Sequence, residues 1–148
     1  MSIDELLRYA AKYGASDLHI TVGNPPIIRV NGKLKKIPGP VLSADDSQAL
    51  LYSILTDDQR AAVEQRRELD LSYTWGTTVQ AGSVVLEYTT PERVRARVNV
   101  FTDMSGVGGA FRIIAAKIRA LEELPAPDSV AELTRCPTGL VLVTGPTG

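Results

Sequence analysis

The chain has 148 residues, of which 44% are hydrophobic and 22% charged, enough for a soluble folded domain with a core of its own. Its formal net charge of −1 excludes a global field that would attract nucleic acid or an anionic membrane surface. No apolar run approaches the roughly 18 residues of a membrane span and no signal-peptide pattern is present, so we expect a cytoplasmic protein; the single cysteine excludes an intrachain disulfide.

The first half of the chain predicts one helix, three short strands and two further helices. A capping box at Ser2 and apolar residues at helical spacing predict a helix over residues 3–13, which Gly14 can end. Two more capping signals, at Ser43 and Thr56, predict the later helices. Alternating apolar residues predict the strands, with an Asn-Gly hairpin turn between the last two: residues 16–22, 27–31 and 33–37. The helix after Ser43 is expected to bury Ala49, Leu50, Ile54 and Leu55.

One residue in this half could suggest catalysis or metal binding. His19 lies in the first predicted strand, and no second histidine or cysteine is near it in the sequence. We therefore expect His19 to make a structural hydrogen bond, and we predict no metal site in the chain.

The second half predicts a meander of strands, one of them rich in arginine. Period-two alternation places strands at residues 69–75, 83–89, 93–101 and 109–115. On the third of these, Arg93, Arg95 and Arg97 share one face, while the valines share the other. The chain is expected to turn over residues 102–107, so that the last two strands form a hairpin.

This hairpin would place Arg97 opposite Arg112. Like charges directly opposed destabilise a sheet, so something must compensate them. One possibility is a bound anion, since the planar, always charged guanidinium suits the oxygens of a triphosphate. The other is that each arginine pairs with a surface carboxylate, and the spacing alone favours neither.

The end of the chain predicts a connector and the start of a second unit. Prolines at 125 and 127 predict a stiff connector, and a short helix then reaches about Arg135. Four apolar residues at 140–143 are typical of a strand buried in a parallel sheet. The first half of a phosphate-binding loop follows. The lysine and the serine or threonine that complete such a loop are absent, so we expect the sequence to be cut within a nucleotide site. The half-motif comprises Gly145, Pro146, Thr147 and Gly148.

Separate blocks of this sequence carry a resemblance to a known family: residues 14–20, 25–32, 97–101, 111–114 and 139–148. They resemble the PilT-like pilus retraction ATPases, a branch of the secretion-type motor ATPases, and follow the order of that family. The resemblance spans most of the chain. The stretch 76–92 departs most from the family, and we assign it no function.

The order of the predicted elements indicates an α+β fold on an antiparallel sheet, and the resemblance implies three parts. Residues 1–115 would form a PAS-like N-terminal domain, with an antiparallel sheet and flanking helices. Residues 116–127 would form a linker. Residues 128–148 would contain the first strand of a RecA-like ATPase domain.

The resemblance also implies a hexameric ATP-driven motor for type IV pilus retraction and twitching motility. Arg97 and Arg112 fall on family positions that help to hold the phosphates, whereas Ser105 stands where many members carry a further arginine. The intact protein would use ATP and Mg²⁺. Because the loop lysine and hydroxyl are absent, the 148-residue chain is expected neither to hydrolyse ATP nor to bind nucleotide tightly.

The partners implied are further copies of the same chain and an inner-membrane pilus platform protein, with no nucleic acid and no direct membrane insertion. The site of action would be the cytoplasm, at the inner face of the inner membrane. Two alternatives stay open: a pilus-assembly or type II secretion ATPase, and a free-standing PAS-like binding or interaction module. The terminal Gly-Pro-Thr-Gly argues against the second.

Overall fold

The computed structural model describes residues 1–75, 94–114, 120–123, 126–127 and 129–145. The strand expected at 83–89 lies outside these residues, as does Arg93. The chain divides into two compact units, Met1–Ala116 and Lys117–Gly148, which are taken separately below.

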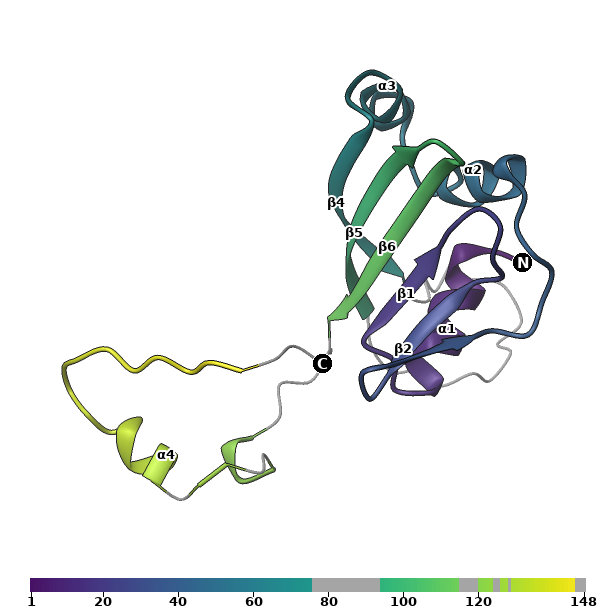
Figure 1. Ribbon diagram of the computed structural model, residues 1–148. Helices are drawn as coiled ribbons and strands as arrows, with labels where there is room; N and C mark the ends of the chain where they lie inside the picture. The colour runs from purple at the N-terminus through teal and green to yellow at the C-terminus, as the bar shows by residue number, and fades with distance from the viewer. Residues whose placement is uncertain (76–93, 115–119, 124–125, 128, 146–148) are drawn as a thin grey trace, which may run out of the picture. The chain divides into compact units, whose positions relative to one another are not determined.

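The first unit is built on a six-stranded sheet whose neighbouring strands are all antiparallel (Figure 1). The order across the sheet is β3-β2-β1-β6-β5-β4. Together with three helices, this sheet confirms the α+β class expected from the sequence. The strands are β1 (Asp17–Ile20), β2 (Ile27–Val30), β3 (Lys33–Lys36), β4 (Glu68–Trp75), β5 (Val94–Asp103) and β6 (Gly106–Ile114).

Two tight turns fix the register of this sheet. Asn31 and Gly32 both have positive φ, at 49° and 76°, which is what a two-residue hairpin turn between β2 and β3 requires. The β5–β6 turn also has only two residues, Met104 and Ser105, so the six-residue turn expected at 102–107 is wrong. The Asp103 carboxylate stabilises this short turn. Its Oδ1 accepts hydrogen bonds from the backbone N–H groups of Ser105 and Gly106, at 2.7 and 3.2 Å.

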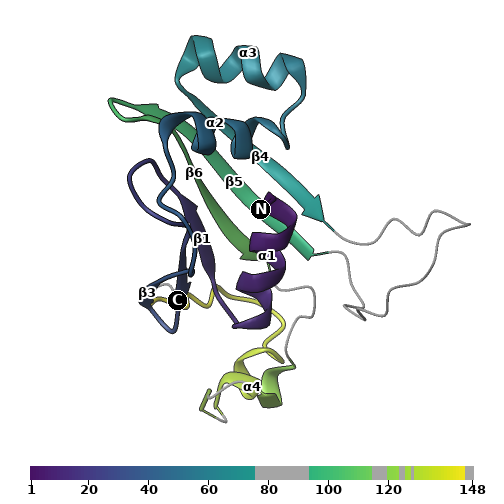
Figure 2. The same cartoon turned by 90° about the vertical axis from the view of Figure 1, so that its right-hand side faces the viewer.

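The three helices in the described part of this unit begin at the capping signals read from the sequence. In each case the hydroxyl of a serine or threonine accepts a hydrogen bond from the backbone N–H of the residue three positions later. The side chain of that later residue accepts a hydrogen bond from the backbone N–H of the serine or threonine. The helices are α1 (Ile3–Lys12), α2 (Ala44–Tyr52) and α3 (Asp57–Arg66). Figure 2 shows α1 and α2 on the same side of the sheet.

The core lies between this helical layer and one face of the sheet. Alternate residues of β5, namely Ala96, Val98 and Val100, are fully buried, as are Leu18 on β1 and Phe111 on β6. The residues between them point to the other face. That face carries the arginines, so the alternation read from the sequence is confirmed for the described part of β5.

The sequence indicated only part of the apolar side of helix α2 and the turn after it. Of the residues expected there, Leu55 is buried and Leu50 and Ile54 pack against the core, as predicted. Ser47 and Leu51 are buried, whereas Ala49, expected on the apolar side, is exposed. The reason lies on the strand: a Cβ added to Gly109 would come within 2.5 Å of a Leu51 methyl, so the glycine makes the room that Leu51 fills. The Ser47 hydroxyl donates to the carbonyl of Val107 at 2.6 Å and fixes the helix on β6.

In the described residues of the second unit, the chain forms a 3-10 turn, Leu121–Glu123, and one short helix, α4 (Ser129–Leu133). The strand expected at 140–143 is not formed, and its four apolar side chains are exposed. A strand of a parallel sheet needs hydrogen-bonded neighbours, and the described residues of this unit contain no other strand. Among the described residues, no helix has the length and apolar character needed to cross a membrane.

Candidate functional site

The candidate site is the sheet face opposite the helices, which we call the open face. Polar and charged side chains line it because they occupy the alternate positions of the strands that bury the core. One row of directly paired residues crosses five strands from β2 to β4. In order, it comprises Arg29, Asp17, Arg112, Arg97 and Ser72.

Arg97 and Arg112 are directly opposite each other, as the sequence predicted. Both side chains are accessible, with exposed fractions of 71% and 66%. Two adjacent guanidinium groups on an exposed surface could hold an anion such as a phosphate group, which each can bind through two parallel N–H donors.

Each arginine nevertheless has its own carboxylate on a neighbouring strand. Nη2 of Arg97 lies 3.3 Å from Oδ2 of Asp70 on β4, and Nε of Arg112 lies 3.4 Å from Oδ1 of Asp17 on β1. The opposed charges are therefore compensated without an external anion. The second possibility, pairing with surface acids, is what the structure shows, and the phosphate role of the two arginines stays a prediction.

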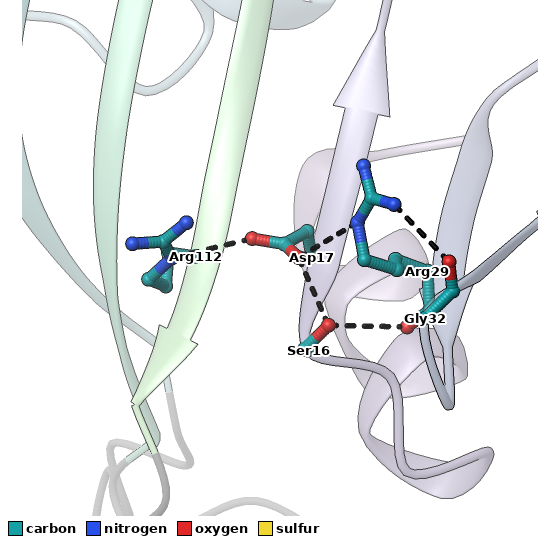
Figure 3. Close-up of polar contacts among 5 residues, drawn as sticks. All are labelled: Ser16, Asp17, Arg29, Gly32 and Arg112. Atoms are coloured by element: carbon teal, nitrogen blue, oxygen red, sulfur yellow. Dashed lines mark hydrogen bonds and ion pairs between the residues drawn. The ribbon is translucent and has the colours of Figure 1, made fainter. Parts of the chain in front are cut away.

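Asp17 is the best-enclosed charged group of this row (Figure 3). Its side chain is only 14% exposed and contacts two cations, with Oδ2 3.3 Å from Nε of Arg29 and Oδ1 facing Arg112. Oδ2 also accepts a hydrogen bond from the Ser16 hydroxyl at 2.9 Å, and Arg29 donates from Nη1 to the Gly32 carbonyl at 3.3 Å. A carboxylate with this many partners holds the side chains around it in fixed positions.

Sequence reasoning did not single out Asp17 as a functional residue. The sequence does show that Asp17 occupies a polar position of an alternating strand. Which side chains it contacts, however, depends on the order of the strands in the sheet. Only when β1 lies between β2 and β6 do Arg29 and Arg112 both face it.

His19 lies on the open face in the next row, beside Ala110 of β6. Its Nε2 has no hydrogen-bond partner among the described residues, so the structural hydrogen bond expected for it is not seen there. Burial lowers the pKa of His19; the nearby Asp17 carboxylate acts in the opposite direction, and Arg29 adds to the lowering. In the described part of the chain, no group of three His, Cys, Asp or Glu side chains could hold a metal ion.

The residues expected to cradle phosphates are placed only in part. Gly145 is exposed and lies outside any regular element, and Pro146, Thr147 and Gly148 fall outside the described residues. Gly145 belongs to the second unit and the arginines to the first, so nothing follows about the distance between them.

Comparison with known proteins shows relatives along the whole chain, although no family model matches it. The sequence is 40% identical over 148 residues to the "type IV pilus retractation ATPase PilT" of Pseudomonas aeruginosa, covering 100% of this chain and 39% of that protein. It is 35% identical over 123 residues to a "twitching motility protein" of Neisseria gonorrhoeae, covering 83% of this chain and 29% of the relative.

A solved structure agrees with these relatives. The crystal structure of the pilus retraction motor PilT with bound ADP superimposes with a TM-score of 0.67 at 35% identity, over 100% of this chain and 39% of that one. The chain thus spans about two fifths of the length of the PilT proteins that it matches. By its sequence and its fold, the chain matches the N-terminal domain of the PilT-like secretion ATPases.

Proposed function

We propose that this chain is the N-terminal domain of an ATP-driven, hexameric motor that retracts type IV pili and so supports twitching motility. The relative of 40% identity is named for pilus retraction, and the matching PilT structure contains ADP. The observation that carries the proposal is the pairing of Arg97 with Arg112 on the open face, since the resemblance to the family implies phosphate contacts at these two positions.

In this proposal the two arginines contact the phosphates of ATP bound to the ATPase domain. Phosphoryl transfer depends mainly on positioning and on neutralising charge at the transferring group, and arginine supplies both. The loop that begins at Gly145 would hold the phosphates through its backbone N–H groups, and Mg²⁺ would neutralise the β- and γ-phosphate oxygens. Asp70, which contacts Arg97 through the terminal nitrogen Nη2, would release part of its hold on that arginine when phosphate binds.

We further propose the domain arrangement that this mechanism needs. Residues 1–115 form a PAS-like domain, residues 116–127 a linker, and residues 128–148 the start of a RecA-like domain. The exposed apolar residues at 140–143 support the last assignment, because such a strand becomes buried once parallel neighbours flank it. The motor would act as a homo-oligomer on a pilus platform protein, in the cytoplasm at the inner membrane.

The phenotype of a deletion separates retraction from the alternative of pilus assembly. Cells lacking the full-length protein should keep their surface pili and lose twitching, and the full-length gene should restore it. Bald cells would indicate an assembly ATPase instead. Normal twitching together with normal pili would contradict both functions and favour an interaction module without a motor role.

A further inference from the structure

The two arginines of the candidate site are held very differently. Arg97 meets Asp70, whose side chain is 53% exposed, and their single contact of 3.3 Å is an exposed surface ion pair. Such pairs contribute little and leave both side chains free to move. Arg112 instead meets Asp17, which is 14% exposed and is itself fixed by two further partners.

The contact to Arg112 uses only one edge of its guanidinium. Asp17 accepts from Nε at 3.4 Å, and no described residue accepts a hydrogen bond from the two terminal nitrogens, Nη1 and Nη2. Figure 3 shows the Asp17 contact reaching the Nε side of the group. The terminal nitrogens are the pair that binds two oxygens of a phosphate side by side, so the donors needed for an anion stay available.

The charge balance of the cluster also favours an anion. If Asp17 paired with Arg112 alone, the carboxylate would cancel the positive charge that a phosphate group needs. Arg29 is the second cation on the same carboxylate, with Nε 3.3 Å from Oδ2, so the three side chains together keep a charge of +1. Ser16 donates to the same Oδ2 and fixes the orientation of the carboxylate.

We propose that Asp17 is a positioning residue for Arg112. It fixes the guanidinium before the nucleotide arrives, so that Nη1 and Nη2 already point to where the phosphate binds. An arginine that is already ordered loses less side-chain freedom when it binds, and misplacing a reacting group by about 1 Å can cost about 10²-fold in rate. The inference rests on the proposed role of Arg112 in ATP hydrolysis. It goes further by assigning a role to a residue that does not touch the nucleotide.

The test is a double-mutant cycle in the full-length protein. Asp17→Asn keeps the shape of the side chain and its capacity to accept from Ser16, and removes the charge that holds Arg112. We expect kcat for ATP to fall about tenfold with KM within about twofold, because the lost order matters most in the transition state. In an Arg112→Ala background, Asp17→Asn should change kcat no further. Asp45→Asn, the same substitution at an exposed position of α2, should leave kcat unchanged.

Each outcome identifies the step that fails. If Arg112→Ala lowers kcat and Asp17→Asn does not, the positioning role is wrong and the proposed function stands. If Asp17→Asn lowers kcat equally in both backgrounds, Asp17 acts independently of Arg112 and the inference is overturned. If Arg112→Ala itself retains wild-type kcat, the proposed function fails first.

A measurement on the unmodified 148-residue chain covers the case in which Asp17→Asn fails to fold. The Nε–H proton of Arg112 should exchange with solvent more slowly in NMR spectra than that of Arg97, because only the former is held by a poorly exposed carboxylate. Equal exchange rates would show that Arg112 is not ordered by Asp17, and would overturn the inference without any variant.

Discussion

Replacing Ser47 by Ala tests how helix α2 is attached to the sheet. Ser47 is fully buried, and its hydroxyl donates to the Val107 carbonyl at 2.6 Å across 60 residues of sequence. The substitution leaves a carbonyl group without this donor in the core. An unsatisfied buried polar group costs about 1–3 kcal/mol, and we expect a loss of about 2 kcal/mol in the free energy of unfolding.

The chain offers a matched control at the C-cap of α2. The Ser53 hydroxyl also donates to a carbonyl at 2.6 Å, that of Leu50, but the bond is local and exposed. Removing it lets water replace the donor, so Ser53→Ala should cost less than about 0.5 kcal/mol. Urea unfolding followed by circular dichroism gives both values. Equal losses for the two variants would refute the reasoning that burial of the acceptor sets the cost of the lost hydrogen bond.

Three further predictions concern the first unit. Gly109→Ala should destabilise it by about 1–3 kcal/mol in urea unfolding, because the added Cβ would lie 2.5 Å from a Leu51 methyl; an unchanged midpoint would contradict that close packing. Tyr73 donates from its hydroxyl to Asp4 at 2.7 Å, and burial together with this bond raises the pKa of Tyr73 to about 12, so Tyr73→Phe should cost about 1–2 kcal/mol and remove one phenol, the one that ionises near pH 12, from the spectrophotometric titration. Burial lowers the pKa of His19, so the unfolded chain binds more protons below about pH 6.5 and stability should fall from pH 7 to pH 5. His19→Gln leaves no histidine in the chain and should flatten this decline; an equally steep decline in the variant would refute it.

The sequence predicted those parts of the fold that depend on neighbouring residues. Ser2, Ser43 and Thr56 each start a helix because the cap and its partner are three residues apart, and both can be read from the chain. The positive φ of Asn31 and Gly32 likewise follows from residue type. The opposition of Arg97 and Arg112 was predicted correctly, although the turn between their strands is shorter than expected, because the turn is centred at the same place.

The parts that the sequence did not predict depend on contacts between distant elements. Leu51 is buried because Gly109, far along the chain, makes room for its side chain, whereas Ala49 on the same helix is exposed. The enclosure of Asp17 requires the strand order that places β1 between β2 and β6, which residue spacing does not give. The apolar residues at 140–143 have the pattern of a buried strand, but a strand forms only where neighbouring strands are available.

The central claim is that Arg97 and Arg112 act on the phosphates of ATP rather than on the stability of the domain. The most direct measurement is kcat for ATP hydrolysis by full-length protein carrying Arg97→Ala or Arg112→Ala, with the melting temperature of each variant. Arg95→Ala, on the same strand and face, is the matched control. An arginine acting on a transferring phosphate contributes roughly 10³–10⁵ in rate, whereas an exposed ion pair contributes only about 0–1 kcal/mol to stability.

We predict that both variants lose at least about 10³-fold in kcat while the melting temperature barely moves, and that Arg95→Ala keeps most of its activity. Wild-type turnover in Arg97→Ala and Arg112→Ala would contradict the account. A large fall in melting temperature that accompanies the loss of activity would show that the two arginines are structural instead.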